Sequence, residues 1–446
     1  MQAIVLAAGE GERMRPLTSS RPKVMLPIGG KPLLEHLVAS AKEAGVEKFV
    51  IVVGYQKEKV MDHFGDGSDL EVSIEYVVQE ERQGTGHALE MAEGLAEDRF
   101  LVLNGDVLCD ADSLKGVIEN EGPVVAAVKV QDPDPDKDWI LEVEDGYLKS
   151  VADKSKPLLS NLVCAGICLL EKKIFEALRM VPASEGGGKQ ERDLMTGLKS
   201  LLADGERIRV AELESWIEIV LPWDILKANE TLMPPDYRGI LGEVEANVIL
   251  SGEIAVGKDT VIRSGSYVAG PVVIGDGCDI GPNNFIKGHT SIGDNVRIGN
   301  GVVIEDSTIM EGTEISHLCY IGDSLVGSGC SLGVGTIVAN RRHDSSTIRS
   351  YVNGTKAETE RRKLGAIVGE GVKTGVGTII YPGTVIEAGR WGTPGEVLWG
   401  LVPVEKPEPQ EEKEGDGNEG DPSEKDEAKE KNAIDESPAA GELEKT

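Results

Sequence analysis

The chain has 446 residues, of which 40% are hydrophobic and only 4% aromatic, with 55 glycines and a formal net charge of −31. This length allows two or three domains, and the acidic balance argues against nucleic acid as a partner, because no basic stripe is present to neutralise phosphates. The six cysteines show no CxxC spacing, and neither a basic leader nor an apolar run of about 20 residues occurs, so we expect a cytoplasmic protein with reduced thiols that does not enter a membrane.

Strand-like and helix-like stretches alternate in residues 1–228. Apolar or β-branched runs predict strands at 2–7, 49–53, 72–78 and 100–103. Apolar residues at helical spacing predict helices at 32–44 and 87–96. The alternation predicts an α/β Rossmann-like domain with a mainly parallel sheet, in which ligands bind beyond the carboxyl ends of the strands.

A glycine-rich basic segment follows the first predicted strand. It reads Leu6-Ala7-Ala8-Gly9-Glu10-Gly11-Glu12-Arg13, and Lys23 follows within Arg21-Pro22-Lys23. Glycines after a strand let the backbone wrap around a phosphate and aim its N–H groups at it. Arg13 and Lys23 supply the positive charge that a leaving pyrophosphate requires.

The pattern LAAGxGxRxxP, followed by PK, resembles the signature of sugar-phosphate nucleotidylyltransferases. Further segments match in the family's order: Gln79 with Gly84 and Thr85 resembles the part that reads the nucleobase, and Asn104-Gly105-Asp106 resembles the strand end that holds Mg²⁺. Glu218 stands where the family usually has the second metal-binding Asp. The resemblance implies catalysis by Arg13 and Lys23, a Mg²⁺ site of Asp106 and Glu218, and nucleotide binding by Leu6, Ala8, Gly9, Gly11, Gln79, Gly84 and Thr85.

The sugar side of this resemblance rests on fewer residues. Asp153-Lys154 resembles the Glu-Lys pair with which the family contacts the sugar, although an ordinary exposed charge pair would give the same sequence pattern. Cys164 stands where acetylamino-sugar enzymes commonly carry Asn. The resemblance implies that the phosphate of N-acetylglucosamine-1-phosphate or glucose-1-phosphate attacks the α-phosphorus of UTP or dTTP, without a protein nucleophile.

A different period begins after a connector at 229–247. Nine aliphatic residues recur at every sixth position from Val256 to Ile304, which fits neither an α-helix nor an alternating strand. The period slips near Met310, resumes at Ile321 and is interrupted by a loop at about 341–363. These repeats predict a left-handed parallel β-helix over 248–404, and its triangular coils favour a homotrimer around a three-fold axis. Residues 405–446, with 16 acidic and 6 basic residues, are expected to be a disordered tail.

A polar phrase interrupts the hexapeptide period. Ser316-His317-Leu318-Cys319-Tyr320, with Asn340 further on, resembles the acetyltransferase site of bifunctional N-acetylglucosamine-1-phosphate uridylyltransferase/glucosamine-1-phosphate acetyltransferases, in a form similar to the archaeal members. The resemblance implies acetyl-CoA as co-substrate, His317 as general base, and Tyr320 and Asn340 at the sugar. Glu305 and Ser346 stand where bacterial members carry Lys for the sugar phosphate, and Lys287 replaces an Arg; Arg341, Arg342 and His343 are possible substitutes.

Three functions stay open at this point. The first is a bifunctional enzyme of UDP-N-acetylglucosamine biosynthesis, which transfers both an acetyl and a uridylyl group. The second is a single-function glucose-1-phosphate uridylyl- or thymidylyltransferase, or a mannose-1-phosphate guanylyltransferase, with a structural β-helix. The third is a non-catalytic nucleotide-sugar sensor. Intact Arg13, Lys23 and Asp106 argue against the sensor. His317 with Asn340 favours the first function over the second, whereas Glu305 favours the second over the first.

Overall fold

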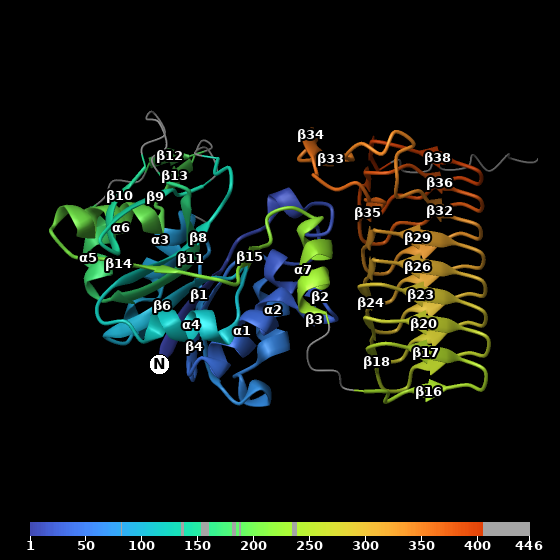
Figure 1. The fold of residues 1–446 in the computed structure, drawn as a ribbon, viewed down its shortest axis with the longest axis horizontal. Coiled ribbons are helices and arrows are strands. Elements are labelled where there is room, and N and C mark those ends of the chain that lie inside the picture. Colours follow the sequence, from blue (N-terminus) through green and yellow to red (C-terminus); the bar gives the residue numbers. More distant parts are fainter. Residues whose placement is uncertain are drawn as a thin grey trace, which may run out of the picture. The chain divides into compact units, whose positions relative to one another are not determined.

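The computed structural model describes residues 1–81, 83–134, 138–152, 160–180, 184–186, 189–233 and 239–404. These residues fold as one compact unit, in which an N-terminal α/β domain packs against a β-helix (Figure 1). In these residues no helix is both long and apolar enough to cross a membrane.

A nine-stranded sheet forms the centre of the N-terminal domain in the described part of the chain, in the order β5–β4–β1–β6–β11–β8–β14–β10–β9. The four strands that the sequence predicts run parallel and are β1 (Gln2–Ala7), β4 (Lys48–Val53), β5 (Ser73–Val78) and β6 (Arg99–Asn104). Leu6 of β1 pairs with Asn104 of β6. The carboxyl ends of these strands therefore meet at one edge of the sheet.

The remainder of the sheet departs from the prediction of a mainly parallel arrangement. β11 (Leu162–Glu171) is antiparallel to β6 and to β8 (Val124–Lys129), and β10 (Tyr147–Val151) is antiparallel to β9 (Leu141–Glu144) and β14 (Arg209–Glu212). Asp145 and Gly146, both at positive φ, close β9 and β10 into a tight hairpin, a connection that only antiparallel strands permit. The sheet is therefore mixed.

Helices cover this sheet (Figure 1). The predicted helix at 32–44 is α1 (Leu33–Glu43), whereas α3 (Gly84–Met91) starts before the predicted His87 and gives way to a 3₁₀ turn at Glu93–Leu95. Gly94 explains the early end, because glycine is a poor helix former. The other helices are α2 (Lys57–Phe64), α4 (Ala111–Ile118), α5 (Lys173–Met180), α6 (Leu194–Ala203) and α7 (Asp224–Leu232), and the short strands are β2 (Pro27–Ile28), β3 (Lys31–Pro32), β7 (Val107–Leu108), β12 (Ser184–Gly186), β13 (Lys189–Glu191) and β15 (Ile217–Glu218).

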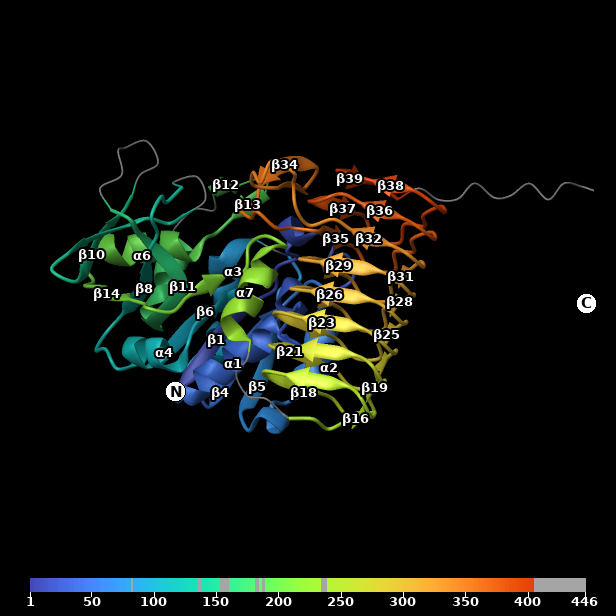
Figure 2. The same ribbon diagram turned by 45° about the vertical axis from the view of Figure 1, so that its right-hand side comes forward.

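The C-terminal domain consists of three parallel sheets, the faces of a triangular β-helix (Figure 2). The first face contains β16 (Glu243–Val244), β19 (Val261–Ile262), β22 (Asp279–Ile280), β25 (Arg297–Ile298), β28 (Glu314–Ile315) and β31 (Ser331–Leu332). The second contains β17 (Ile249–Ser251), β20 (Tyr267–Ala269), β23 (Phe285–Lys287), β26 (Val303–Glu305), β29 (Tyr320–Gly322), β32 (Ile337–Val338), β36 (Ile379–Ile380) and β38 (Val397–Leu398). The third contains β18 (Ile254–Val256), β21 (Val272–Ile274), β24 (Thr290–Ile292), β27 (Thr308–Ile309), β30 (Leu325–Val326), β35 (Ala366–Val368), β37 (Thr384–Ile386) and β39 (Leu401–Val402).

The hexapeptide residues fill the interior of this prism. All nine positions from Val256 to Ile304 are buried, with exposed fractions of 3% or less. Val261 pairs with Asp279, an offset of 18 residues, whereas Val303 pairs with Tyr320, an offset of 17. One residue is therefore missing from that coil, which accounts for the slip near Met310. The predicted left-handed parallel β-helix is confirmed.

The loop that interrupts the period contains a β-hairpin. Its strands are β33 (Arg349–Val352) and β34 (Thr355–Glu358), which pair antiparallel around Asn353-Gly354. Both turn residues have positive φ, +48° and +76°, as a type I′ turn requires.

The third face packs against the N-terminal domain through a shared hydrophobic cluster. Met14 and Leu17, from the segment after the glycine turn, lie in this cluster with Ile348 and Ile367 of the β-helix. Asn229 of α7, which is fully buried, donates to Thr308 Oγ1 at 2.9 Å and accepts from the Gly29 N–H at 2.8 Å. Both views show α7 beside the β-helix (Figures 1 and 2).

Candidate active site

The phosphate-binding turn follows directly from the end of β1. Gly11 has φ +70°, and a Cβ at this position would lie 2.7 Å from the Cβ of Lys23. Only glycine fits there, since both the backbone angle and the close approach exclude a side chain. A 3₁₀ turn at Glu12–Met14 follows, and burial of Met14 fixes the position of Arg13 next to it.

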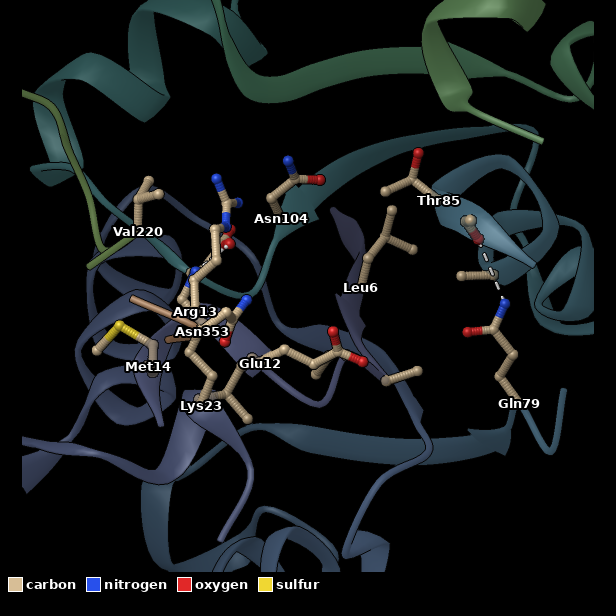
Figure 3. A pocket seen from close by; sticks show the side chains of 18 residues that line it. Leu6, Glu12, Arg13, Met14, Lys23, Gln79, Thr85, Asn104, Val220 and Asn353 are labelled. Carbon is tan, nitrogen blue, oxygen red and sulfur yellow. Dashed lines mark hydrogen bonds and ion pairs between the residues drawn. The ribbon is translucent and has the colours of Figure 1, made fainter. Parts of the chain in front are cut away.

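A cavity of about 420 Å³ opens at this edge of the sheet (Figure 3). Its walls bring together ten residues that the sequence assigned to nucleotide binding, catalysis or metal binding, although they come from four separate segments. They are Leu6, Ala8, Gly9, Gly11, Arg13, Lys23, Gln79, Gly84, Thr85 and Asp106.

Gln79 and Gly84 form one end of the cavity. The buried Gln79 side chain donates through Nε2 to the Gly84 carbonyl at 3.3 Å, and Nε2 lies 2.9 Å from His87 Nδ1. Among the residues that the structure describes, both contacts of this side chain use the amide nitrogen, which leaves Oε1 for a ligand. Gly84 has φ +92°, and a Cβ there would lie 2.4 Å from the Arg192 carbonyl, which explains the glycine. Thr85 Oγ1 accepts from the Leu194 N–H at 3.0 Å, so its hydroxyl also holds α6 in place.

The opposite end of the cavity is charged. Lys23 Nζ lies 2.7 Å from Asp106 Oδ2, and Lys23 is buried. Glu218 reaches the same place because β15 pairs with β7, with Glu218 opposite Val107, and the Ile219 N–H donates to the Asp106 carbonyl at 3.0 Å. Burial and the Asp106 carboxylate raise the pKa of Glu218 to about 7, against the opposing effect of Lys23 and Arg13.

This pair of carboxylates fits a magnesium ion. Two neighbouring carboxylates repel each other when both are charged, and a divalent cation removes that cost. Mg²⁺ takes few protein ligands and fills the rest of its shell with water and phosphate oxygens. Within the residues that the structure describes, no group of three or more His, Cys, Asp or Glu could hold a metal ion.

The remaining residues on the sugar side are divided between described and undescribed parts. Asp153 and Lys154 lie outside the described residues. Cys164 lies on β11, where a bulge follows it; Gly166 in that bulge has φ +72°, and a Cβ there would lie 2.6 Å from Asn104 Nδ2. The bulge therefore brings β11 up to the strand end that carries Asp106.

His317 lies at an exposed corner of the β-helix, between β28 and β29. Its Nδ1 accepts a hydrogen bond from the Asn300 N–H at 3.1 Å. A neutral imidazole has one donor and one acceptor nitrogen, so the ring proton of His317 is on Nε2. A general base acting through Nε2 needs the other tautomer, whereas the tautomer present makes Nε2 a hydrogen-bond donor.

Tyr320 and Asn340 meet at Glu305. The Tyr320 hydroxyl donates to Glu305 Oε1 at 2.7 Å, Asn340 Nδ2 donates to it at 3.0 Å, and Lys287 Nζ lies 2.8 Å from Oε2. Burial alone would raise the pKa of Glu305, but the contacts with Lys287, Tyr320 and Asn340 outweigh burial and lower the pKa to about 2. Glu305 is therefore ionised, and its carboxylate neutralises the positive charge of Lys287.

A second cavity, of about 920 Å³, lies beside the loop at 341–363. Arg341, Arg342 and His343 line it together with Tyr381 and Trp399. Arg342 is paired with Asp344 at 2.6 Å, and Ser346 Oγ also donates to Asp344, at 2.8 Å. The sequence-predicted substitutes for the missing Lys residues are thus gathered at one cavity.

Asn353 also lines the first cavity, although no sequence pattern assigned it to a site. It comes from the turn of the β33–β34 hairpin, more than 300 residues after the glycine turn. The Val352-Asn353-Gly354-Thr355 sequence carries the signal of a type I′ hairpin, but nothing in it indicates which cavity the turn would reach.

Comparisons with known proteins cover both parts of the chain. The profile of the nucleotidyl transferase family matches residues 2–232, and that of the GMPPB C-terminal domain matches residues 268–389. "Bifunctional protein GlmU" of Methanococcus maripaludis strain C7 is 42% identical over 86% of this chain and 92% of the relative. The protein of the same name from Methanocaldococcus jannaschii is 36% identical over 88% and 93%. "Bifunctional sugar-1-phosphate nucleotidylyltransferase/acetyltransferase" of Sulfurisphaera tokodaii is 34% identical over 89% and 97%.

Proposed function

The chain belongs to the family of bifunctional GlmU proteins, and from this membership we propose that it transfers a nucleotidyl group to a sugar-1-phosphate and an acetyl group to an amino-sugar-1-phosphate. The observation that carries the first activity is the cavity in which Arg13, Lys23 and Asp106 face the Gln79 and Gly84 end. UTP or dTTP, with N-acetylglucosamine-1-phosphate or glucose-1-phosphate, are the proposed substrates.

The chain's own residues supply binding and charge for nucleotidyl transfer. The glycine turn presents backbone N–H groups to the phosphates, and Gln79 Oε1 accepts from the nucleobase. A sugar phosphate oxygen forms the new bond to the α-phosphorus while the bond to pyrophosphate breaks, and Arg13 and Lys23 stabilise the charge that develops on the leaving group. Asp106 and Glu218 would hold Mg²⁺, which supplies neutralisation of phosphate charge when bound.

Acetyl transfer is proposed at the second face of the β-helix. The amine nitrogen of glucosamine-1-phosphate attacks the thioester carbonyl of acetyl-CoA; the C–N bond forms, the C–S bond breaks, and the proton lost by the amine leaves with the CoA thiol. Because Nδ1 of His317 accepts from Asn300, we propose that Nε2–H donates to the developing oxyanion, in place of the general base expected from the sequence. Tyr320 and Asn340 adjoin the sugar, and the cations of the second cavity take its phosphate.

The second face also carries the proposed trimer contact. Its outward residues form an apolar column in continuous register: Ile249, Tyr267, Phe285, Val303, Tyr320, Ile337, Ile379 and Val397. The third face is covered by the N-terminal domain, and the first presents polar residues such as Asp279, Arg297 and Glu314. An exposed apolar stripe of this length is typical of an interface, and a homotrimer would place three such columns together.

One assay tests both activities. The full-length protein is incubated with UTP, dTTP or GTP and with glucose-, N-acetylglucosamine- or mannose-1-phosphate, and pyrophosphate release is measured; acetyl-CoA with glucosamine-1-phosphate is scored by free thiol. We expect pyrophosphate with UTP or dTTP, and thiol release with the amino sugar. Absence of pyrophosphate with every pair would refute the nucleotidyl transfer.

A second candidate is a nucleotidylyltransferase whose β-helix is only a scaffold. Two observations favour it: the match of residues 268–389 to the GMPPB C-terminal domain, and the Glu305 anion where a phosphate-binding Lys is expected. Pyrophosphate release without thiol release, at saturating glucosamine-1-phosphate and acetyl-CoA, would select this candidate.

A further inference from the structure

The nucleotide cavity has one wall that comes from the β-helix domain. Asn353 lines it with Arg13, Met14 and Lys23. Figure 3 places Asn353 on the Arg13 and Met14 side of the cavity, across from Gln79 and Thr85. The N-terminal domain therefore does not enclose the cavity alone.

The hairpin that carries Asn353 is held firmly at its base. Ser350 is fully buried, and its Oγ donates to the Gly383 carbonyl at 3.0 Å. Thr359 Oγ1 donates to the Ile348 carbonyl at 2.6 Å. Between these anchors, Tyr351 and Val352 pack against the shared hydrophobic cluster that contains Met14. The turn is thus fixed relative to Arg13, because both are attached to one core.

The Asn353 side chain is available to a ligand. A type I′ turn explains why Asn or Gly occupies this position, but it does not use the side-chain amide. That amide makes no hydrogen bond to any residue that the structure describes, and Asn353 is exposed although its hairpin neighbours are packed. Asn353 lies on the same side of the cavity as Arg13 and Lys23, the cations assigned to the phosphates (Figure 3).

We propose that Asn353 binds the triphosphate by donating from Nδ2 to the phosphates of the leaving pyrophosphate, so that the β-helix domain contributes a nucleotide-binding residue to nucleotidyl transfer. The inference rests on the proposed function of this cavity. A neutral amide donor suits the position, because Arg13 and Lys23 already supply positive charge and the amide adds a directed hydrogen bond without further repulsion between cations.

Two substitutions separate the side chain from the turn. Asn353→Gly keeps the type I′ geometry and removes the amide, whereas Asn353→Asp keeps size and turn preference and adds a negative charge. Asn247, also exposed and at positive φ (+66°), provides the matched pair Asn247→Gly and Asn247→Asp in the first coil. For each full-length variant we would measure the KM for the nucleoside triphosphate, the KM for the sugar-1-phosphate, and Tm.

We expect Asn353→Gly to raise the KM for the triphosphate about 3- to 10-fold, the loss of one hydrogen bond, with the sugar-1-phosphate KM and Tm unchanged. Asn353→Asp should raise it further, by an amount that shrinks at high salt. Both Asn247 variants should match the wild type. A triphosphate KM within two-fold of wild type in both Asn353 variants would overturn the proposal, as would a fall in Tm with both KM values rising together. Inactivity of the wild type would instead contradict the proposed function.

Discussion

Replacing Lys23 with methionine removes the charge at the phosphate end of the cavity while keeping an unbranched stem against Gly11. Lys23 Nζ lies 2.7 Å from Asp106 Oδ2 with only 10% of its side chain exposed, so its charge acts in a water-poor site. Loss of one such donor costs about 2–4 kcal/mol of transition-state stabilisation, which corresponds to roughly 30- to 1000-fold in kcat. Pyrophosphate release at saturating substrates measures this change.

The same variant should respond to magnesium in the opposite direction. Without a bound cation Lys23 pairs with Asp106, so it competes for a carboxylate that would hold Mg²⁺. We expect Lys23→Met to need less Mg²⁺ for half-maximal activity even though kcat falls. Lys31→Met, which removes a half-exposed lysine paired with Glu35 at 3.3 Å, is the control and should change neither value. A kcat within three-fold of wild type, or a higher Mg²⁺ requirement, would refute this account of Lys23.

Three further outcomes are expected. His317→Ala should lower thiol release 10²–10⁴-fold, the range for a positioned catalytic group. His317→Gln should keep more activity, because Gln can donate a hydrogen bond but cannot act as a base. Equal loss in both variants would instead support His317 as the general base. Phe285→Arg on the second face should shift the mass measured by light scattering from trimer to monomer, and Val261→Arg on the first face should not; a trimer in both variants would exclude the apolar column as the interface. The pKa of Glu305 is lowered to about 2 from 4.5, so its ionised form stabilises the folded state fully above about pH 5, and this stabilisation is lost as the pH falls through 4.5 toward 2. In Glu305→Gln the free energy of unfolding should therefore depend less on pH in this acid range. An unchanged acid-unfolding midpoint would contradict this.

Most of the fold could be predicted from the local periodicity of apolar residues. The aliphatic residues at every sixth position could be assigned to an interior because each coil repeats the same short strand, and Val256 to Ile304 are buried as predicted. The strand ends at Leu6 and Asn104 also followed from apolar runs, which is why the residues of the nucleotide cavity could be named before their distances were known. Antiparallel β11 could not, because its neighbours β6 and β8 are distant in sequence and no local pattern records their direction.

The features of the two sites that the sequence did not predict share a physical cause, since each depends on a contact between distant segments. The tautomer of His317 is set by a backbone N–H on the preceding coil, at Asn300. The charge of Lys287 is neutralised by its ion pair with Glu305 on the next strand of the same face. Asn353 reaches the nucleotide cavity only through the packing of its hairpin on the shared cluster. Residue types predict which chemistry is possible, whereas these pairings determine which nitrogen or charge remains available.

The nucleotide cavity depends on the β-helix for its shape as well as for Asn353. Arg21, which precedes Pro22-Lys23, pairs with Glu311 and Ser328 of the β-helix. The two domains also approach closely at Gly369, where a Cβ would lie 3.0 Å from the Cβ of Pro16. Ordering a loop costs about 1–2 kcal/mol per residue in backbone entropy, and the segment after Gly11 recovers part of that cost by burying Met14 and Leu17 in the shared cluster. The sequence patterns change at residue 228, but the nucleotide site does not belong to the N-terminal domain alone, because the loop that carries Arg13 and Lys23 is ordered by both domains.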